Sequence, residues 1–378
     1  MLLPNVTKYN PLGLPRDASR YLEFLIIPLI FFLLYRFRKN FGALKIPLGI
    51  IVAMFLLNIG TFLINDVEFI DSLEYTFKVG TPVLLFICLV IHYRNTQFNI
   101  ARYVNVLLLF LLFLTVVGIF FFDVSFNHGR TWLPIYFASL HTHTYVLVSI
   151  GVGLSFWFVN RRYYLYLLLF LLAFFYFVYA GYGIRTAVVF FGIFFVAITF
   201  KIHTRFQVLW LQLASFFPLL IVLLLVFLSQ INFNEFSSGR LTMYQAKYQL
   251  LKEYKTEEFL LGRGYGSDYI TTTEWWYDEK NSHNDVLTFL VENGIPYALL
   301  FLGLIFFLII YPGRIKLVYI SILVGYLATS LLSNGIATRT LAGYLLFIVL
   351  ARAYLNEQIQ RNKQTKATLS DQSTLLDN

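Results

Sequence analysis

Long apolar runs, separated by short polar segments, dominate the sequence. Many of the runs approach about 20 residues, the length that a helix needs to cross about 30 Å of hydrocarbon at about 1.5 Å per residue. The pattern predicts an all-α polytopic membrane protein with about 11 (10–12) transmembrane helices. The candidate helices span 21–35, 43–64, 73–93, 103–122, 136–159, 163–180, 186–200, 207–231, 285–311, 316–333 and 340–355.

The spans and the polar segments divide the chain into four regions. Residues 1–231 form an N-terminal transmembrane bundle, residues 232–284 form one large loop, and residues 285–355 form the C-terminal transmembrane helices. Residues 356–378 are polar and lack apolar periodicity, so we expect a disordered cytoplasmic tail. No soluble domain is predicted.

Basic residues alternate from one loop to the next, which predicts the orientation because cytoplasmic loops are enriched in lysine and arginine. Alternate loops and the tail carry most of them: Arg36, Arg38, Lys39, Lys45, Arg94, Arg102, Arg161, Arg162, Lys201, Arg205, Arg314, Lys316, Arg352, Arg361, Lys363 and Lys366. The intervening short loops hold acidic residues with few basic ones. This alternation places the tail in the cytoplasm and the loop 232–284 outside.

Composition supports lipid as the main solvent of this chain. Of the 378 residues, 58% are hydrophobic and only 13% are charged. A soluble domain of this size could not bury so much apolar surface. The net charge of +9 is spread over the cytoplasmic loops instead of forming one stripe, so nucleic acid is not an expected partner. The one cysteine, Cys88, lies within an apolar run, which rules out a disulfide framework.

The loop 232–284 is the candidate functional region, because long loops in compact proteins are usually functional or disordered. Leu241, Tyr244, Tyr248 and Leu251 repeat at helical spacing, with polar residues such as Lys247 on other faces. We expect an amphipathic helix on the outer membrane surface. A glycine-rich stretch around Arg263 follows, and three aromatic residues, 275–277, precede the ninth predicted helix.

Three stretches of the chain resemble the O-antigen ligase and O-antigen polymerase superfamily, whose members handle polyprenyl-diphosphate-linked glycans. They are Tyr182-Gly-Ile-Arg-Thr-Ala-Val-Val, Ser238-Gly-Arg-Leu-Thr-Met-Tyr-Gln, and the stretch that begins Ser282-His-Asn-Asp and ends at Gly294. The spacing from His283 to Gly294 is the most specific feature. The chain departs from family ligases in helix count, since these typically have twelve, and it lacks the paired arginine-rich loops of some polymerases.

The resemblance implies a glycan donor linked to undecaprenyl diphosphate, with a glycan or lipid acceptor, in a bacterial inner membrane. Arginine binds phosphate oxygens through its planar fork and keeps its proton, so Arg185 and Arg240 are the expected diphosphate ligands, with Arg263 and Arg339 as secondary candidates. His283 is the expected general base. Asp285 is a candidate to orient it. These residues otherwise serve as interfacial anchors and helix caps.

The remaining expectations concern the rest of the site. Glu292 either belongs to the site or pairs with a neighbouring helix. His141 and His143 point about 200° apart on a helix, so they cannot share a metal; we expect them to line a helix. No metal and no cofactor are predicted. Membrane lipids are expected partners, and the resemblance adds a flippase and a chain-length regulator.

Four functions stay open from the sequence. The first is polymerisation of repeat units of a surface polysaccharide such as O-antigen, capsule or exopolysaccharide, and we favour it slightly. The second is a ligase that transfers the glycan to a lipid A-core or a protein. The third is a flippase for the lipid-linked unit, disfavoured because the charges lie at helix ends rather than midway along helices. The fourth is a non-catalytic partner in polysaccharide assembly.

Overall fold

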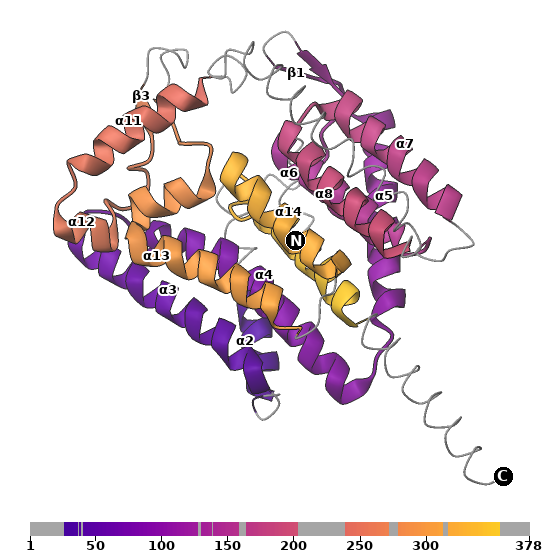
Figure 1. Cartoon of the computed structure of the whole chain (residues 1–378), viewed down its shortest axis with the longest axis horizontal. Coiled ribbons are helices and arrows are strands. Elements are labelled where there is room, and N and C mark those ends of the chain that lie inside the picture. Colours follow the sequence, from indigo (N-terminus) through magenta and orange to yellow (C-terminus); the bar gives the residue numbers. More distant parts are fainter. Residues whose placement is uncertain are drawn as a thin grey trace, which may run out of the picture.

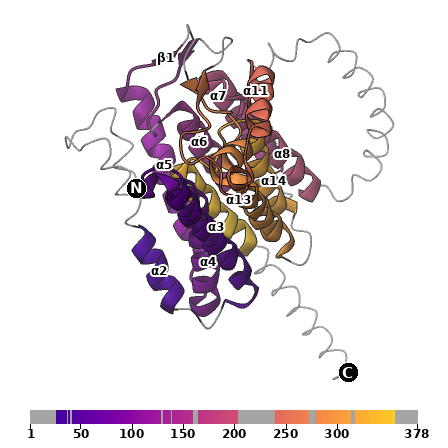
Figure 2. The same ribbon diagram turned by 90° about the vertical axis from the view of Figure 1, so that its left-hand side faces the viewer.

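The computed structural model is a bundle of helices with two short hairpins, drawn in Figure 1 and turned by 90° in Figure 2. It describes residues 26–36, 38, 41–127, 130–137, 139–158, 164–202, 239–271, 279–312 and 317–355. The prediction of an all-α membrane protein is confirmed at this level. The predicted helix 207–231, the tail 356–378 and the aromatic residues 275–277 lie outside the described residues.

The first half of the chain contributes seven α-helices and a 3-10 turn among the described residues. Each helix overlaps a predicted range, because uninterrupted apolar sequence sets its length. The elements are α2 (Ile26–Arg36), η3 (Gly42–Leu44), α3 (Lys45–Ile64), α4 (Phe69–Thr96), α5 (Ile100–Phe121), α6 (Leu140–Ser155), α7 (Tyr164–Tyr182) and α8 (Arg185–Ile202).

A hairpin precedes α6, where the sequence pattern predicts only the end of one helix and the start of the next. It pairs β1 (Ser125–Asn127) with β2 (Arg130–Trp132) in antiparallel register. Just beyond β2, the Leu133 N–H donates to the Gly181 carbonyl, 3.0 Å away, at the end of α7. The hairpin thereby fixes the connection between α7 and α8 beside the start of α6.

The second half begins with the described part of the large loop. It contains α11 (Arg240–Lys252), α12 (Thr256–Leu261), β3 (Ile270–Thr271) and β4 (Glu279–Lys280), where β3 and β4 pair antiparallel. Three helices follow: α13 (Asp285–Ile310), α14 (Leu317–Leu332) and a last helix, Thr340–Leu355. Figure 1 shows α11, β3 and the β1 hairpin at the same end of the molecule.

Five helices in the described part of the chain are long and apolar enough to cross a membrane. They are Gly42–Ile64, Phe69–Thr96, Ile100–Phe121, Leu165–Tyr182 and Asp285–Ile310; shorter apolar helices run Arg185–Thr199, Leu317–Leu332 and Thr340–Leu355. Many large apolar side chains remain exposed on these helices, for example Phe120 at 79% and Tyr176 at 71%. Such exposure suits a protein whose surroundings are hydrocarbon.

Helix α13 is broken at Gly294, the glycine singled out by its spacing from His283. Gly294 has φ 84° and ψ 170°, a conformation essentially reserved for glycine. Pro296 has no N–H, so it cannot bond the carbonyl of Glu292 four residues earlier. The break therefore leaves two backbone carbonyls without helical partners in the middle of an apolar helix.

The large loop satisfies these two carbonyls. The Gly264 N–H donates to the Glu292 carbonyl at 3.0 Å, and the Arg263 N–H donates to the Val291 carbonyl at 3.1 Å. The Tyr254 hydroxyl also donates to the Val291 carbonyl, at 3.1 Å. In a helix within lipid, freed backbone groups must find such partners. The glycine-rich stretch is thus a docking segment for the α13 break.

Candidate functional site

Five helix starts converge at one end of the bundle and define the candidate site. Hydrogen bonds and electrostatic interactions link the starts of α6, α8, α11, α13 and the last helix. Ser139 caps α6 by accepting from the Thr142 N–H at 3.4 Å, and Asn284 caps α13 by accepting from the Leu287 N–H at 3.1 Å. Helix starts carry partial positive charge, so this arrangement favours an anion.

His283 stands immediately before α13 in a left-handed backbone conformation, with φ 47°. Histidine adopts this conformation more readily than most residues, but surrounding contacts must hold it there. Its own N–H donates to Asn281 Oδ1 at 3.4 Å, and the same oxygen accepts from Asn334 Nδ2 at 2.9 Å. Ser282, the residue before His283, is buried, and its hydroxyl donates to the Asp268 carboxylate. His283 is therefore fixed from both sides.

Asp285 holds the segment between α14 and the last helix against α13. Its two carboxylate oxygens accept from the Gly335 N–H at 2.9 Å and the Thr338 hydroxyl at 3.0 Å. The side chain is fully buried. The hydrogen bonds of Asp285 thus serve the 333–339 segment, which brings Arg339 into the site, instead of His283, which the sequence suggested it orients.

Arg339 joins the start of the last helix to the start of α6. One terminal nitrogen donates to Ser139 Oγ at 3.0 Å and to Thr142 Oγ1 at 3.3 Å, while Nε donates to the Asn334 carbonyl at 3.2 Å. All three acceptors are neutral. Burial lowers the pKa of this guanidinium, and the nearby charge of Asp285 opposes that shift.

Arg240 and Arg185 open α11 and α8, as the resemblance implied. A terminal nitrogen of Arg240 donates to the Leu332 carbonyl at the end of α14. Its Nε is buried and finds no hydrogen-bond partner among the described residues. Burial lowers the pKa of Arg240, and the charge of Arg185 lowers it further. The two arginines, distant in sequence, therefore lie within electrostatic reach of each other.

Tyr145 connects α6 to α8 beneath these arginines. Its hydroxyl lies 2.7 Å from Thr186 Oγ1, the residue after Arg185. Tyr145 is completely buried and interacts electrostatically with Arg339, Asp285 and Arg240. The sequence pattern did not single out Tyr145, because a tyrosine five residues into an apolar helix carries no local signal.

His141 and His143 have different surroundings, although they are two residues apart. His141 is half-buried, and the charges of Arg339, His283 and Arg240 act on its imidazole. His141 therefore lies beside the site residues; the sequence favoured a helix-lining residue near the outer half of its helix and left a substrate contact as the lesser alternative.

His143 has a structural role instead. Its Nδ1 accepts from the N–H groups of Phe137 at 3.2 Å and Tyr136 at 3.3 Å, which places the proton on Nε2. Nε2 then donates to the Tyr182 hydroxyl at 2.9 Å, and that hydroxyl donates to the Pro134 carbonyl at 3.2 Å. This chain of hydrogen bonds uses both ring nitrogens, so His143 holds the α5–α6 connection on the end of α7.

The site carries surplus positive charge. Arg185, Arg240 and Arg339 contribute three permanent cations. Of the two acidic residues named above, Asp285 acts on Arg339, whereas Asp268 pairs with Lys247. Among the described residues, neither Arg240 nor Arg339 forms an ion pair with a carboxylate within 4.0 Å, whereas Lys247 and Arg263 are paired with Asp268 and Glu258. Arg240 and Arg339 are partly buried and Arg185 is exposed. Cations that lie near one another favour an anionic ligand, since an anion offsets their repulsion.

Arg263 and Glu292, both named from the sequence, lie away from this cluster. Arg263 Nε donates to Glu258 Oε1 at 2.9 Å, and its guanidinium sits 4.3 Å from the centre of the Tyr254 ring. Glu292 is buried and accepts from the Asp268 N–H at 3.3 Å. Arg263 supports the α12 segment, and Glu292 supports the fold of the loop over α13.

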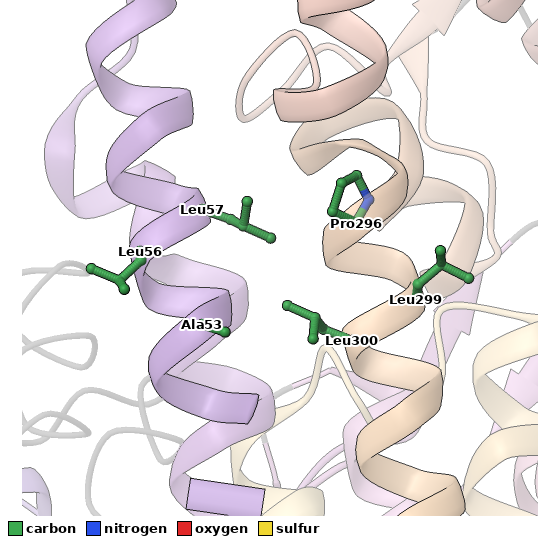
Figure 3. A pocket seen from close by; sticks show the side chains of 6 residues that line it. All are labelled: Ala53, Leu56, Leu57, Pro296, Leu299 and Leu300. Carbon is green, nitrogen blue, oxygen red and sulfur yellow. The ribbon is translucent and has the colours of Figure 1, made fainter. Parts of the chain in front are cut away.

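Two further features bear on what the site could hold. An apolar pocket of about 560 Å³ lies between α3 and α13 (Figure 3), and its lining residues are Ala53, Leu56, Leu57, Pro296, Leu299 and Leu300. It contains none of the candidate site residues. Among the described residues, no group of three or more histidine, cysteine, aspartate or glutamate side chains could hold a metal ion.

No protein-family model matches the sequence, and no curated protein matches it significantly.

Proposed function

We propose that this chain is a membrane glycosyltransferase that uses a polyprenyl-diphosphate-linked glycan as donor and extends a second lipid-linked unit. The proposal deepens the resemblance to the O-antigen ligase and polymerase superfamily, and one observation carries it. Three arginines and two histidines gather where five helix starts meet, and the carboxylate of Asp285 acts on Arg339. A lipid-linked diphosphate is negatively charged, so the positively charged arginines of this cluster would attract it.

The arginines have the chemistry for the leaving group. Guanidinium groups bind phosphate oxygens through paired N–H donors and stay charged at neutral pH. Arg240 has a buried Nε that needs an acceptor, and Arg185 and Arg240 act on each other's charge. A diphosphate between them would remove that repulsion. As the bond to the sugar breaks, the same groups stabilise the negative charge that grows on the diphosphate.

His283 has the chemistry for the acceptor. A sugar hydroxyl is a poor nucleophile until a base takes its proton, and imidazole is the side chain best suited to this near neutral pH. In the proposed step, the acceptor oxygen bonds to the anomeric carbon while the bond from that carbon to the diphosphate oxygen breaks. The hydroxyl proton moves to His283, the electron pair leaves with the diphosphate, and the anomeric carbon inverts.

The proposal places the site on the extracytoplasmic side of a bacterial inner membrane, with about eleven spans and the loop 232–284 outside. Its support is the distribution of basic residues. Arg94, in a loop predicted to be cytoplasmic, donates to the Tyr311 hydroxyl at 2.8 Å, at the far end of α13 from His283. The predicted cytoplasmic cations and the site cations therefore occupy opposite ends of the same helix.

The decisive experiment supplies purified protein with a synthetic undecaprenyl-diphosphate repeat unit and follows lipid-linked products by mass. We expect a ladder of longer products from the wild type. His283→Asn should lose about 10²- to 10⁴-fold in rate, the usual contribution of a general base. Arg240→Lys should raise the donor concentration needed. Arg263→Lys is the matched control, since it changes an arginine of the same loop that pairs with Glu258, and it should retain activity.

The other outcomes have defined meanings. Product formed only after addition of a lipid A-core acceptor would assign the ligase reaction to the same site. Movement of the lipid-linked unit across vesicle membranes without a new glycosidic bond would assign transport and refute the transferase. Full activity of His283→Asn or Arg240→Lys would also refute the proposed roles.

A further inference from the structure

A buried carboxylate in the large loop contacts both halves of the candidate site. Asp268 is fully buried and accepts from the Ser282 N–H at 2.8 Å, the Ser282 hydroxyl at 2.7 Å and the Thr288 hydroxyl at 2.7 Å. It also pairs with Lys247 Nζ at 2.9 Å, with both side chains at 0% exposure. No other side chain in the described part of the loop accepts from so many groups.

The partners of Asp268 lie next to the residues that the proposed reaction uses. Lys247 is seven residues after Arg240 on α11, which is about two helical turns. Ser282 directly precedes His283, and Thr288 lies in the first turn of α13. A single carboxylate thus connects the helix that carries an arginine to the residue that carries the imidazole.

The connection is a rigid one. Both ends of the Lys247–Asp268 pair are removed from water, so the charges interact strongly and neither can shift without losing its partner. Lys247 also donates to the Asp268 backbone carbonyl, and the Asp268 N–H donates to Glu292. The backbone and the side chain of Asp268 are both fixed, so Ser282 is held immediately before the left-handed backbone of His283.

We propose that Asp268 is a positioning residue, which with Lys247 sets the distance between Arg240 and His283. The structural part of this proposal concerns geometry alone and holds for any chemistry at the site. The kinetic part rests on the proposed transferase function. The two parts are tested by separate measurements, so failure of one is distinguishable from failure of the other.

The geometric test measures the distance between α11 and the β4 strand by double electron–electron resonance. Spin labels go on Gln245→Cys and Glu279→Cys, two exposed positions, in a background where Cys88 is replaced by serine. We expect a narrow distance distribution for wild-type Asp268. Asp268→Ala should broaden it, while Asp268→Asn, whose amide oxygen still accepts from Ser282, should broaden it less.

A second background separates positioning from simple neutralisation of Lys247. Removing Asp268 alone leaves a buried, unpaired lysine, which can unfold the protein for that reason only. The double variants Lys247→Met/Asp268→Ala and Lys247→Met/Asp268→Asn carry no unpaired lysine. We expect the alanine double variant to keep a broad distribution and the asparagine double variant to be narrower. A narrow, wild-type distribution in Lys247→Met/Asp268→Ala would overturn the proposal.

The kinetic test uses the product ladder described above. In Lys247→Met/Asp268→Ala we expect kcat to fall about 10²-fold, because a shift of about 1 Å in a reacting group costs that much, with KM for the donor unchanged. Lys247→Met/Asp268→Asn should recover part of the loss. A larger KM with unchanged kcat would show that Asp268 serves donor binding instead of His283. Broadened distances without any transferase activity in the wild type would retain the geometry and reject the reaction.

Discussion

Replacement of Gly294 by alanine is the sharpest test of how the loop and the membrane helix fit together. Gly294 has φ 84° and ψ 170°, and an added Cβ would lie 2.4 Å from the Leu260 carbonyl oxygen. Real Cβ atoms do not approach backbone so closely, so the backbone of α12 must move away. Figure 1 shows α12 beside α13, the helix that contains this glycine.

The magnitude follows from two terms. A non-glycine residue in this backbone region costs about 1–3 kcal/mol, and overpacking costs about 1–3 kcal/mol more. If α12 moves away, the overpacking is relieved and the hydrogen bonds from Arg263 and Gly264 to the α13 break are lost instead, at about 1 kcal/mol each, which is a cost of the same size. We therefore expect Gly294→Ala to lower the free energy of unfolding by about 2–6 kcal/mol, a large share of a typical 5–15 kcal/mol.

The assay is unfolding by sodium dodecyl sulfate in mixed micelles, followed by tryptophan fluorescence. Gly303→Ala is the matched control, because Gly303 lies in the same helix and an added Cβ there meets no atom within 4 Å. Alanine favours helix by about 1 kcal/mol over glycine, so this control should be as stable as the wild type or more so. A Gly294→Ala protein within about 1 kcal/mol of the wild type would refute the reasoning, since that is the size of a single hydrogen bond.

Three further predictions follow from the site. Asp285→Asn should lower the free energy of unfolding by about 1–3 kcal/mol, because an amide cannot accept from both Gly335 and Thr338 as a carboxylate does; equal stability in the same titration would contradict this. His143→Phe should cost about 1–3 kcal/mol by leaving buried N–H groups without an acceptor, whereas a stability equal to that of the wild type would reject its structural role. His141→Asn should keep stability and lower kcat/KM of the transfer about tenfold, as loss of about 1.4 kcal/mol at the site gives; unchanged kinetics would remove His141 from the site.

The helix ranges were predictable because hydrophobic runs set them directly. The predicted range 43–64 matches η3 with α3, and 340–355 matches the last helix, because a lipid-crossing segment is defined by its own composition. The β1 hairpin was missed, since its six residues are short and carry no alternating pattern. The break in α13 has a local signal in Gly294 and Pro296, yet the carbonyls that it frees are satisfied by a loop some 30 residues away, which the pattern does not contain.

The site was predictable only in part. Arg185, Arg240, His283 and Arg339 were named from the sequence, and the structure brings them together. Arg263, a secondary candidate from the sequence, pairs with Glu258. Glu292, which the sequence left open between the site and a neighbouring helix, accepts from the Asp268 N–H. Lys247 was assigned to a polar helix face and is in fact buried, because Asp268 neutralises it. The sequence gives no sign of that pairing, since a lysine and an aspartate 21 residues apart meet only when the loop folds. Whether α11 lies on the membrane surface stays a prediction.

The hydrogen bond from Arg339 to Ser139 spans 200 residues of chain. During synthesis, the start of α6 leaves the ribosome long before Arg339 is made. A growing polypeptide therefore contains Arg185 and Arg240 before it contains Arg339. The cluster of cations is therefore complete only when the final helix has been inserted. Under the proposed function, a partly made protein would lack one of the groups expected to hold the donor.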